Sequence, residues 1–441
     1  MTLVSGWGRF PVVDSELLRP RSFEAVGEAV VTGSVARGNG RAYGDAAIGA
    51  ARTIAMTGFD RVRSFDPVTG RIRLEVGVLL SDLIDTFGPR GFLPFVVPGT
   101  RFVSVGGAIA ADVHGKNHHC EGGFGRYVDS ILLRTGQGET IEASREQNSD
   151  AFFATVGGMG LTGVILEATM RLRPVETGWI RERVISASDL DAAMRALDAG
   201  DSATYSVAWI DCAARGSDLG RSLIYLGEHA RTGEIADGAG AFPAGKNPGL
   251  AVPVDLPSMT LNRYSIRAFN ELYYRMGARR AGASHVVSLY PYFFPLDSIS
   301  DWNRIYGRRG FLQHQCVIPE LGARAVLGEI LDRVARRGDA SFLAVLKKLG
   351  QGDGILSFPL PGYTLALDFP VKGDILNFLD EIDRLVVAAG GRLYLAKDAR
   401  QSRATFEAGY PALRRFNAIR KLLDPAGTIR SKLSQRLFDE V

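Results

Sequence analysis

A glycine-rich segment near the N-terminus has the composition of an anion-binding loop. Residues 35–45 read VARGNGRAYGD, and their three glycines expose consecutive backbone N–H groups beside Arg37 and Arg41. Such a row of donors binds phosphate oxygens, and guanidinium groups add charge-assisted hydrogen bonds. The segment is not a dinucleotide-binding fingerprint, because residues 45–51 lead into a predicted strand instead of a helix. A tight surface turn rarely needs so many glycines and arginines together, so the sequence predicts a phosphate cradle.

Two further glycine motifs lie downstream. The first combines Pro98-Gly99-Thr100 with SVGGAIA at 104–110, and its small side chains let the backbone approach a flat or bulky group, or a packed neighbouring element. The second, GMGLTG at 158–163, is a literal GxGxxG. A strand is predicted after it, whereas a Rossmann site requires a helix there. We therefore interpret this motif as packing or ligand-contacting backbone and not as a nicotinamide site.

Three of the six histidines fall within six residues, in the segment DVHGKNHH at 112–119. Asp112 and the histidines are residue types that bind metal ions. No predicted helix presents them on one face, however, and Gly115 interrupts the segment. We therefore predict no metal site and interpret the segment as a polar strip beside a cofactor, where it supplies hydrogen bonds and a titratable group.

Composition indicates a globular protein of two or three domains. The chain has 441 residues, 46% hydrophobic and 23% charged, which excludes disordered and coiled-coil proteins. Its net charge of +4 comes from basic residues interspersed with acids, so nucleic acid is not an expected partner. Three widely spaced cysteines favour a reducing compartment. The sequence predicts neither a signal peptide nor a membrane-spanning helix, and thus a protein that is cytoplasmic or peripheral at the inner membrane.

Short strands and helices must position these segments. Alternating polarity predicts strands over Thr53–Thr57 and Arg71–Val78, and helical spacing predicts a helix over Leu79–Phe87. The glycine-rich zone ends in a predicted strand, Gly163–Leu172. A longer segment, Gly227–Asn262, is rich in Gly, Ala and Pro without periodicity. Such a segment is typical either of a mobile surface insertion or of a flap over a site.

The order of the motifs resembles the flavin-binding domain of the vanillyl-alcohol-oxidase/p-cresol-methylhydroxylase class. Within that class the whole chain resembles the decaprenylphosphoryl-β-D-ribose 2′-oxidase family, over nearly all of its 441 residues. The resemblance is carried by RGNGRAYGD, PGT, SVGGAIAADVHGKNHH and ATVGGMGLTG, then by SVAWIDC, PLD (295–297), WNRIYG, FLQHQCVIP (311–319), LSFPLPG, LDFPVK (367–372) and GGRLYLAKDAR (390–400).

The resemblance implies an α+β protein with a two-domain FAD-binding fold of the PCMH type and a sheet-based substrate domain. The expected FAD-binding domain is 1–177 and the substrate domain is 178–391. The C-terminal segment 392–441 begins with a predicted strand, RLYLAK, and is expected to return to the first domain. Many members of the wider class tether FAD through a histidine in the first glycine motif. Arg41 takes that place here and cannot form the bond, so FAD is expected to be non-covalent.

The resemblance also assigns residues to the cofactor, with the pyrophosphate in the first glycine motif and the isoalloxazine and ribityl chain along the later ones. The expected FAD-binding residues are Ala36, Arg37, Gly38, Asn39, Gly40, Arg41, Ala42, Tyr43, Gly44, Asp45, Gly99, Thr100, Ser104, Val105, Gly106, Gly107, Ala111, Asp112, His114, Gly115, Gly163, Ile165 and Tyr394.

The implied reaction is oxidation of the ribose 2′-hydroxyl of a polyprenylphosphoryl-ribose to the 2-keto sugar, with hydride transfer to the flavin. Lys397 is the leading candidate to orient or deprotonate the hydroxyl, with Tyr43 and Lys116 as polar neighbours. An ordinary ion pair between Lys397 and Asp398 is the alternative. The expected substrate-contacting residues are Trp209, Phe293, Gln313, Gln315, Lys347, Thr364, Ala366 and Lys397.

Some of these assignments leave alternatives open. Gln313 and Gln315 alternate on one predicted strand and so share a face, which suits sugar hydroxyls. Lys347 is the expected phosphate ligand, although Lys348 beside it is equally placed by sequence. Mycobacterial members of the family carry Cys at the place of Ala366. A Tyr and an Asn of the family correspond to Phe293 and Thr364, so the sugar and the lipid length stay open.

Further expectations concern partners and rival functions. An NAD(P)H-dependent short-chain reductase would convert the keto product into the arabinose epimer, and the lipid substrate implies peripheral membrane contact. The Gly227–Asn262 segment would then be a flap that admits the lipid tail. Three rival hypotheses remain, namely an FAD-dependent oxidase of a free sugar, alditol or aldonolactone, a non-catalytic flavin-binding partner protein, and a nicotinamide dehydrogenase.

Overall fold

The computed structural model describes residues 2–245, 249–257, 260–338 and 343–438. The N-terminal part of the chain builds two sheets. In the four-stranded sheet, three parallel strands place the first glycine motif directly after β3. Its strand order is β1 (Thr2–Ser5), β2 (Val12–Leu18), β4 (Arg52–Ala55) and β3 (Ser34–Arg37), with α1 (Phe23–Ala29) between β2 and β3.

The second sheet is antiparallel and carries the other two glycine motifs on its connections. It contains the predicted strands over 71–78 and 163–172, which the structure bounds at Arg71–Glu75 and Val164–Pro174. Its order is β5 (Val62–Phe65), β6 (Arg71–Glu75), β10 (Val164–Pro174), β8 (Val128–Arg134) and β9 (Thr140–Ser144), with β7 (Phe92–Pro94) paired to β10.

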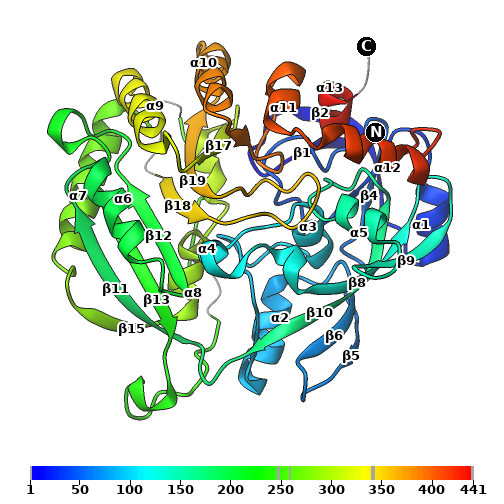
Figure 1. Cartoon of the computed structure of the whole chain (residues 1–441), viewed down its shortest axis with the longest axis horizontal. Coiled ribbons are helices and arrows are strands. Elements are labelled where there is room, and N and C mark those ends of the chain that lie inside the picture. Colours follow the sequence, from blue (N-terminus) through cyan, green and yellow to red (C-terminus); the bar gives the residue numbers. More distant parts are fainter. Residues whose placement is uncertain (1, 246–248, 258–259, 339–342, 439–441) are drawn as a thin grey trace.

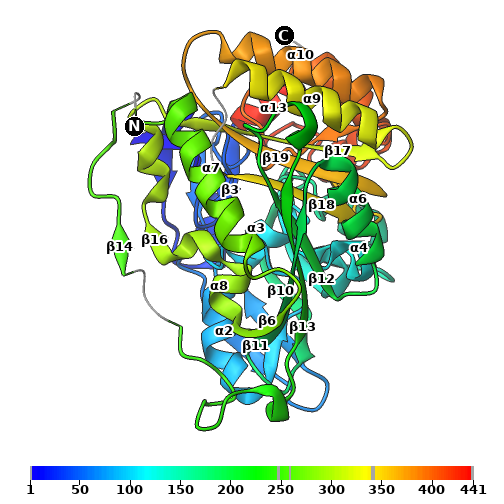
Figure 2. The same ribbon diagram turned by 90° about the vertical axis from the view of Figure 1, so that its left-hand side faces the viewer.

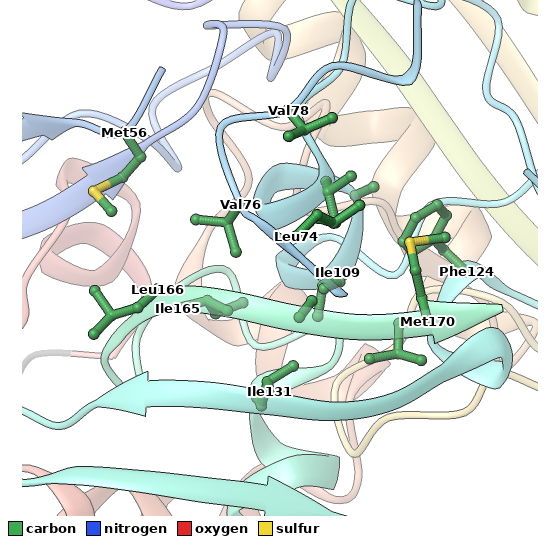
Figure 3. Close-up of a cluster of buried hydrophobic side chains, with 14 of the residues drawn as sticks. Met56, Leu74, Val76, Val78, Ile109, Phe124, Ile131, Ile165, Leu166 and Met170 are labelled. Atoms are coloured by element: carbon green, nitrogen blue, oxygen red, sulfur yellow. The ribbon is translucent and has the colours of Figure 1, made fainter. Parts of the chain in front are cut away.

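Helices cover this sheet and close its core. The predicted helix over 79–87 is α2 (Leu80–Phe87), and α3 (Val105–Ala110) is the small-residue motif itself. Figure 3 shows Leu74, Ile109, Ile131 and Met170, from β6, α3, β8 and β10, gathered in one apolar cluster. Each is at most 1% exposed, so α3 is held by the core while its glycines stay free for other contacts. α4 (His118–Glu121) and α5 (Ser149–Thr155) complete this part.

The middle of the chain forms an eight-stranded sheet, seen in green and yellow in Figure 1. Helices α6 (Leu190–Ala199), α9 (Ala323–Arg337) and α10 (Ile375–Ala388) bury one of its faces. α7 (Arg263–Ala278) packs on β11 and β13 (Figure 2), and α8 (Leu289–Phe293) follows β15. The order is β15 (Ser284–Ser288), β11 (Trp179–Ala187), β13 (Ser222–His229), β12 (Tyr205–Ile210), β18 (Ala344–Leu349), β19 (Gly362–Pro370), β17 (Phe311–Pro319) and β20 (Arg392–Leu393).

Two expectations about local structure change in detail. The predicted strand RLYLAK is shorter, because β20 ends at Leu393 and the chain turns at 394–398. The segment 227–262 is not uniformly irregular. It contains the end of β13, a short turn of helix at Thr232–Glu234, and β14 (Leu250–Ala251), which pairs with β16 (Ile299–Ser300). Residues 246–248 and 258–259 of this segment lie outside the described residues.

The C-terminal segment touches both parts of the molecule. β20 pairs with β17 of the large sheet, whereas Ile429 and Ser431 bridge to Ser34 and Gly49 beside the four-stranded sheet. Figure 1 shows its last helices, in red, beside the blue N-terminal strands. These helices are α11 (Arg403–Gly409), α12 (Leu413–Leu423) and α13 (Lys432–Leu437).

Candidate active site

A cavity of about 490 Å³ lies between the glycine motifs and the large sheet. One wall is backbone-rich and comes from residues 36–47, 97–116 and 159–165. The opposite wall carries side chains of β12, β13, β17, β18 and β19, together with the turn at 394–397. The cavity therefore combines a surface suited to a flat ligand with a surface of polar side chains, as expected of a cofactor and substrate site.

The two N-terminal glycine motifs meet at this cavity. A Cβ atom on Gly38 would lie 2.0 Å from Ser104 Oγ, so only glycine fits there. The Ser104 hydroxyl in turn accepts a hydrogen bond from the backbone N–H of Gly107, at 3.3 Å, and caps α3. The Asn39 amide donates to the Phe102 carbonyl at 2.9 Å, which ties the cradle to the loop before α3.

Polar atoms aimed into the cavity lack protein partners. Within the described part of the chain, Arg41 Nε and His114 Nδ1 are buried without a hydrogen-bond partner, and both residues line the cavity. Buried polar groups are normally satisfied, so such atoms indicate a ligand. Gly99 also lines the cavity, and a Cβ atom there would meet nothing within 4 Å. A cationic side chain, free donors and open backbone fit a phosphate-bearing flat cofactor such as FAD.

Most of the expected cofactor residues lie on the cavity wall. The structure places there Ala36, Gly38, Asn39, Gly40, Arg41, Ala42, Tyr43, Gly99, Thr100, Ser104, Gly106, Gly107, Ala111, His114, Gly115, Gly163, Ile165 and Tyr394.

Five expected cofactor residues do not line this cavity, and the structure gives them contacts within the protein. Asp112 instead accepts hydrogen bonds from Gly125 N–H, at 2.9 Å, and Ser357 Oγ, at 2.5 Å, and so braces a loop of the large domain. The Arg37 guanidinium turns back and donates to the Ser5 carbonyl at 2.7 Å. The five residues are Arg37, Gly44, Asp45, Val105 and Asp112.

The other three have structural roles as well. Asp45 forms an ion pair with Arg436 of α13, with 3.0 Å between oxygen and nitrogen. Gly44 allows close packing, since a Cβ atom there would lie 1.8 Å from the Asp398 carbonyl oxygen. Val105 is 0% exposed and points into the core under α3. The resemblance assigned these residues to the cofactor through the motifs that contain them, and the structure adds these contacts within the protein.

The opposite wall holds a compact polar group around Lys397. Its side-chain nitrogen lies 3.4 Å from the Tyr43 ring centroid, within the range of a cation–π contact when the amine is protonated. Gln313 donates to Asp368 Oδ1 at 2.6 Å, and the Tyr306 hydroxyl donates to Asp368 Oδ2 at 3.3 Å. Gln313 and Asp368 are direct partners in the β17–β19 register, which explains their contact.

Burial shifts the pKa values of the ionisable side chains in this group. Desolvation lowers the pKa of Lys397, and the Asp368 carboxylate opposes part of that shift. Burial raises the pKa of Asp368 and raises that of Tyr43 well above its ordinary value. A Lys whose pKa is lowered toward neutrality has a larger fraction of neutral amine at physiological pH, and this form can accept a proton. The alternative ion pair of Lys397 with Asp398 does not describe this site, because Asp398 pairs with Arg436 at 2.8 Å.

The two other expected lysines occupy separate parts of the wall. Lys347 lines the cavity, whereas Lys348 turns to the opposite face and pairs with Asp201 at 2.6 Å. Enclosure lowers the pKa of Lys347 to about 8 and that of Lys116 to about 7. Lys116 lies 4.1 Å from the Tyr292 ring centroid and donates to the carbonyl of the same residue.

Gln315 completes the wall beside His114. Its amide nitrogen lies 2.9 Å from His114 Nε2 and 3.2 Å from Thr364 Oγ1. Burial lowers the pKa of His114 well below its ordinary value, so the ring is neutral. The remaining expected substrate residues on the wall are Trp209, Phe293, Thr364 and Ala366.

The rest of the histidine segment turns away from the cavity. His118 Nδ1 accepts from the Gly350 N–H at 3.0 Å, and His119 Nε2 lies 2.9 Å from the Ala203 carbonyl. Among the described residues, no group of three or more His, Cys, Asp or Glu side chains could hold a metal ion.

Several wall residues were missed by sequence reasoning. Trp7 stacks on Arg41, with 4.0 Å from the guanidinium carbon to the ring centroid, yet it lies far from any motif. Asp297 also lines the cavity, and Asp368 contacts the wall residue Gln313. Both acids lie within quoted motifs, PLD and LDFP, but nothing local distinguishes them from surface acids. Phe269 and Tyr273 of α7 also line the cavity, and no motif marks them.

Comparisons with known proteins agree with this geometry. Residues 19–144 match the FAD binding domain family, and residues 366–437 match the D-arabinono-1,4-lactone oxidase family. Decaprenylphosphoryl-β-D-ribose oxidase of Mycolicibacterium smegmatis is 37% identical over 98% of this chain and 96% of its own length. The chain belongs to the decaprenylphosphoryl-β-D-ribose oxidase family. This member is an FAD-dependent oxidoreductase with an α+β fold, as the sequence resemblance predicted.

Two further proteins are similar to this chain. A Streptomyces coelicolor protein, described by its place in the mprA 5′ region, is 34% identical over 82% of this chain and 100% of its own length. L-gulonolactone oxidase of Bos taurus is 24% identical over 91% of this chain and 88% of its own length.

We expect this family member to release its FAD without bond cleavage. The resemblance assigns Arg41 to the place of the tethering histidine of the wider class, and in the structure Arg41 packs on Trp7. A guanidinium has no nucleophilic ring nitrogen to carry the flavin, so denaturation should free the cofactor. Acid precipitation of the yellow holoenzyme should leave all flavin in the supernatant, measured by absorbance. A yellow pellet that resists washing would contradict the assignment.

Proposed function

We propose that this protein oxidises the ribose 2′-hydroxyl of a polyprenylphosphoryl-β-D-ribose to the 2-keto sugar. One observation carries the proposal, namely that Lys397 and Lys347 line the same cavity with Gln313 and Gln315 on its polar wall. Lys397 suits a reacting hydroxyl, the glutamines suit the other sugar hydroxyls, and Lys347 suits a phosphate. The name of the Mycolicibacterium smegmatis relative describes this substrate class.

Each residue has a role set by its surroundings. The neutral Lys397 amine, held over the Tyr43 ring, accepts the hydroxyl proton as the carbon loses a hydride. FAD, when bound at the glycine wall, supplies the hydride acceptor. Gln313 lines the cavity and its amide nitrogen is held by Asp368, which limits the orientations of the side chain. Phe293 and Trp209 are buried and line the cavity, so a bound sugar would meet apolar surface there.

Replacement of Lys347 by Ala tests the phosphate assignment. We expect KM for the phosphorylated substrate to rise about 10- to 100-fold, with a smaller change in kcat, because a charged hydrogen bond to phosphate contributes about 1.5–3 kcal/mol. Steady-state kinetics measure both constants. Lys348→Ala is the matched control, since Lys348 faces Asp198 and Asp201 outside the cavity. Equal changes in the two variants would argue against a phosphate subsite.

One specific observation favours an alternative substrate. The match of residues 366–437 to D-arabinono-1,4-lactone oxidase covers Lys397 and Ala366 of the wall, so an aldonolactone is the second candidate. Anaerobic mixing of the holoenzyme with farnesylphosphoryl-ribose should bleach the flavin absorbance near 450 nm within seconds, whereas L-gulono- and D-arabinono-lactone should not. Bleaching by a lactone alone would favour the alternative, and bleaching by neither would favour a non-catalytic flavoprotein.

The chemistry of the proposed product determines which reaction must follow. A 2-keto sugar must be reduced at the same carbon to give the arabinose epimer, which requires a hydride donor such as NAD(P)H. We propose a short-chain reductase as the partner for this step, with the lipid-linked keto sugar passed between the two enzymes.

A further inference from the structure

Helix α7 has an apolar face that the fold leaves exposed. Its inner side, with Ile266 and Asn270, is buried against β11 and β13. Its outer side carries Tyr264, Leu272 and Met276, whose exposed fractions are 68%, 60% and 58%. Figure 2 shows this helix on the face of the molecule turned to the viewer. An α-helix with apolar residues on both sides is unusual at a water-exposed surface, where the outer side is normally polar.

The exposed face is continuous with the cavity. Phe269 and Tyr273 lie on the same helix and line the cavity. Their rings are stacked with 5.9 Å between centroids, and the Tyr273 ring lies 4.7 Å from that of Trp209 on the cavity wall. The aromatic series from Phe269 to Trp209 thus joins the outside of α7 to the substrate wall without an intervening charged residue.

Positive charge accompanies the apolar face. Residues 262–280 contain five arginines and a single acid, Glu271. Glu271 pairs with Arg275 at 2.5 Å and with Arg221 at 2.7 Å. Arg267 and Arg279 are both exposed. By the period of an α-helix, Arg279 lies between Tyr264 and Leu272 around the axis, and Arg267 lies on the other side of Tyr264. Apolar side chains together with arginines on one helix are the composition of an interfacial membrane-binding helix.

We propose that α7 docks on an anionic lipid bilayer and that the aromatic series leads the prenyl chain of the substrate from the bilayer into the cavity. The second part rests on the proposed function. Leu272, Met276 and Tyr264 enter the headgroup region, while Arg267 and Arg279 contact lipid phosphates. No helix among the described residues has both the length and the apolar character to cross a bilayer, so α7 lies in the plane of the surface. A bilayer is favoured over a second protein copy because the net charge of α7 complements anionic lipid and repels itself.

Vesicle flotation of the holoenzyme tests the docking surface. The wild type should float with vesicles of phosphatidylcholine and phosphatidylglycerol, and more weakly at high salt or with phosphatidylcholine alone. Leu272→Ser/Met276→Ser should weaken binding at least tenfold, and Arg267→Gln/Arg279→Gln should weaken binding to the anionic vesicles only. The matched control is Leu321→Ser/Leu422→Ser, which removes apolar residues that are 94% and 74% exposed elsewhere.

Three outcomes would overturn the proposal. The wild type could fail to float, the α7 variants could float like the control, or α7 could mediate a concentration-dependent dimer that the Leu272→Ser/Met276→Ser variant abolishes. Flavin absorbance and thermal melting establish that each variant is folded.

Turnover separates this proposal from the proposed function. With a short-prenyl substrate in solution, the Leu272→Ser/Met276→Ser variant should match the wild type, and with decaprenyl substrate in vesicles it should lose at least tenfold in kcat/KM. Absence of turnover in the wild type would count against the proposed function, whereas flotation would still report on the docking surface. Equal turnover of vesicle-borne substrate by both proteins would overturn the proposed lipid path.

Discussion

Lys397→Ala should lower kcat by about 10²- to 10⁴-fold, the usual contribution of a positioned general base. The expectation follows from the place of the Lys397 amine, 3.4 Å from the Tyr43 ring centroid on the polar wall. In the wild type, the ammonium form must lose its proton before the amine can act. kcat/KM should therefore rise with pH through the Lys397 pKa and level above it, while the variant should lack this rise. Stopped-flow reduction of the flavin measures the step directly.

Two companion variants make the result specific. Asp368→Asn removes the carboxylate whose charge raises the Lys397 pKa, so the acidic limb of the profile should move to lower pH. Lys421→Ala, at an exposed position of α12, should leave the profile unchanged. Near-normal flavin reduction by Lys397→Ala would show that Lys397 is not the base. A shift of the acidic limb of the Asp368→Asn pH profile to higher pH would show the same.

Gly99→Leu should yield a folded protein with a weakened affinity for FAD. A Cβ atom at Gly99 meets nothing within 4 Å, and the backbone there is not in the left-handed region, so the protein itself tolerates a side chain. The new side chain would project into the glycine wall and occupy space needed by the cofactor. Overpacking costs about 1–3 kcal/mol, which corresponds to an affinity for FAD about 10- to 100-fold weaker. Titration of the apoprotein with FAD, followed by flavin fluorescence, measures the change.

The control for this variant is Gly233→Leu. Gly233 also has nothing within 4 Å of a Cβ atom, but it lies in the short helical turn at Thr232–Glu234, away from the cavity. Both apoproteins should melt within a few degrees of the wild type, because neither substitution meets protein atoms. Wild-type affinity for FAD in Gly99→Leu would show that the cofactor does not pass this backbone.

Local patterns allowed much of the fold to be predicted. The helix at Leu80–Phe87 follows from apolar spacing, and the strand after GMGLTG correctly excluded a Rossmann site. The shared face of Gln313 and Gln315 follows from the two-residue period of a strand, and both line the cavity. These features depend on residues only a few positions apart. The geometry of a helix or strand directly determines which of these residues share a face.

Within the site, the sequence by itself determined the residue types and the glycine motifs that the FAD-binding family shares. Only the tertiary structure decided that Gly38 meets Ser104, that Asp368 fixes Gln313, and that Lys347 faces the cavity while Lys348 faces Asp201. It also showed that the side chains of Arg37, Asp45 and Asp112 make contacts within the protein. The physical reason is that sequence period sets which side of an element a residue occupies, whereas the packing of distant elements sets what that side meets.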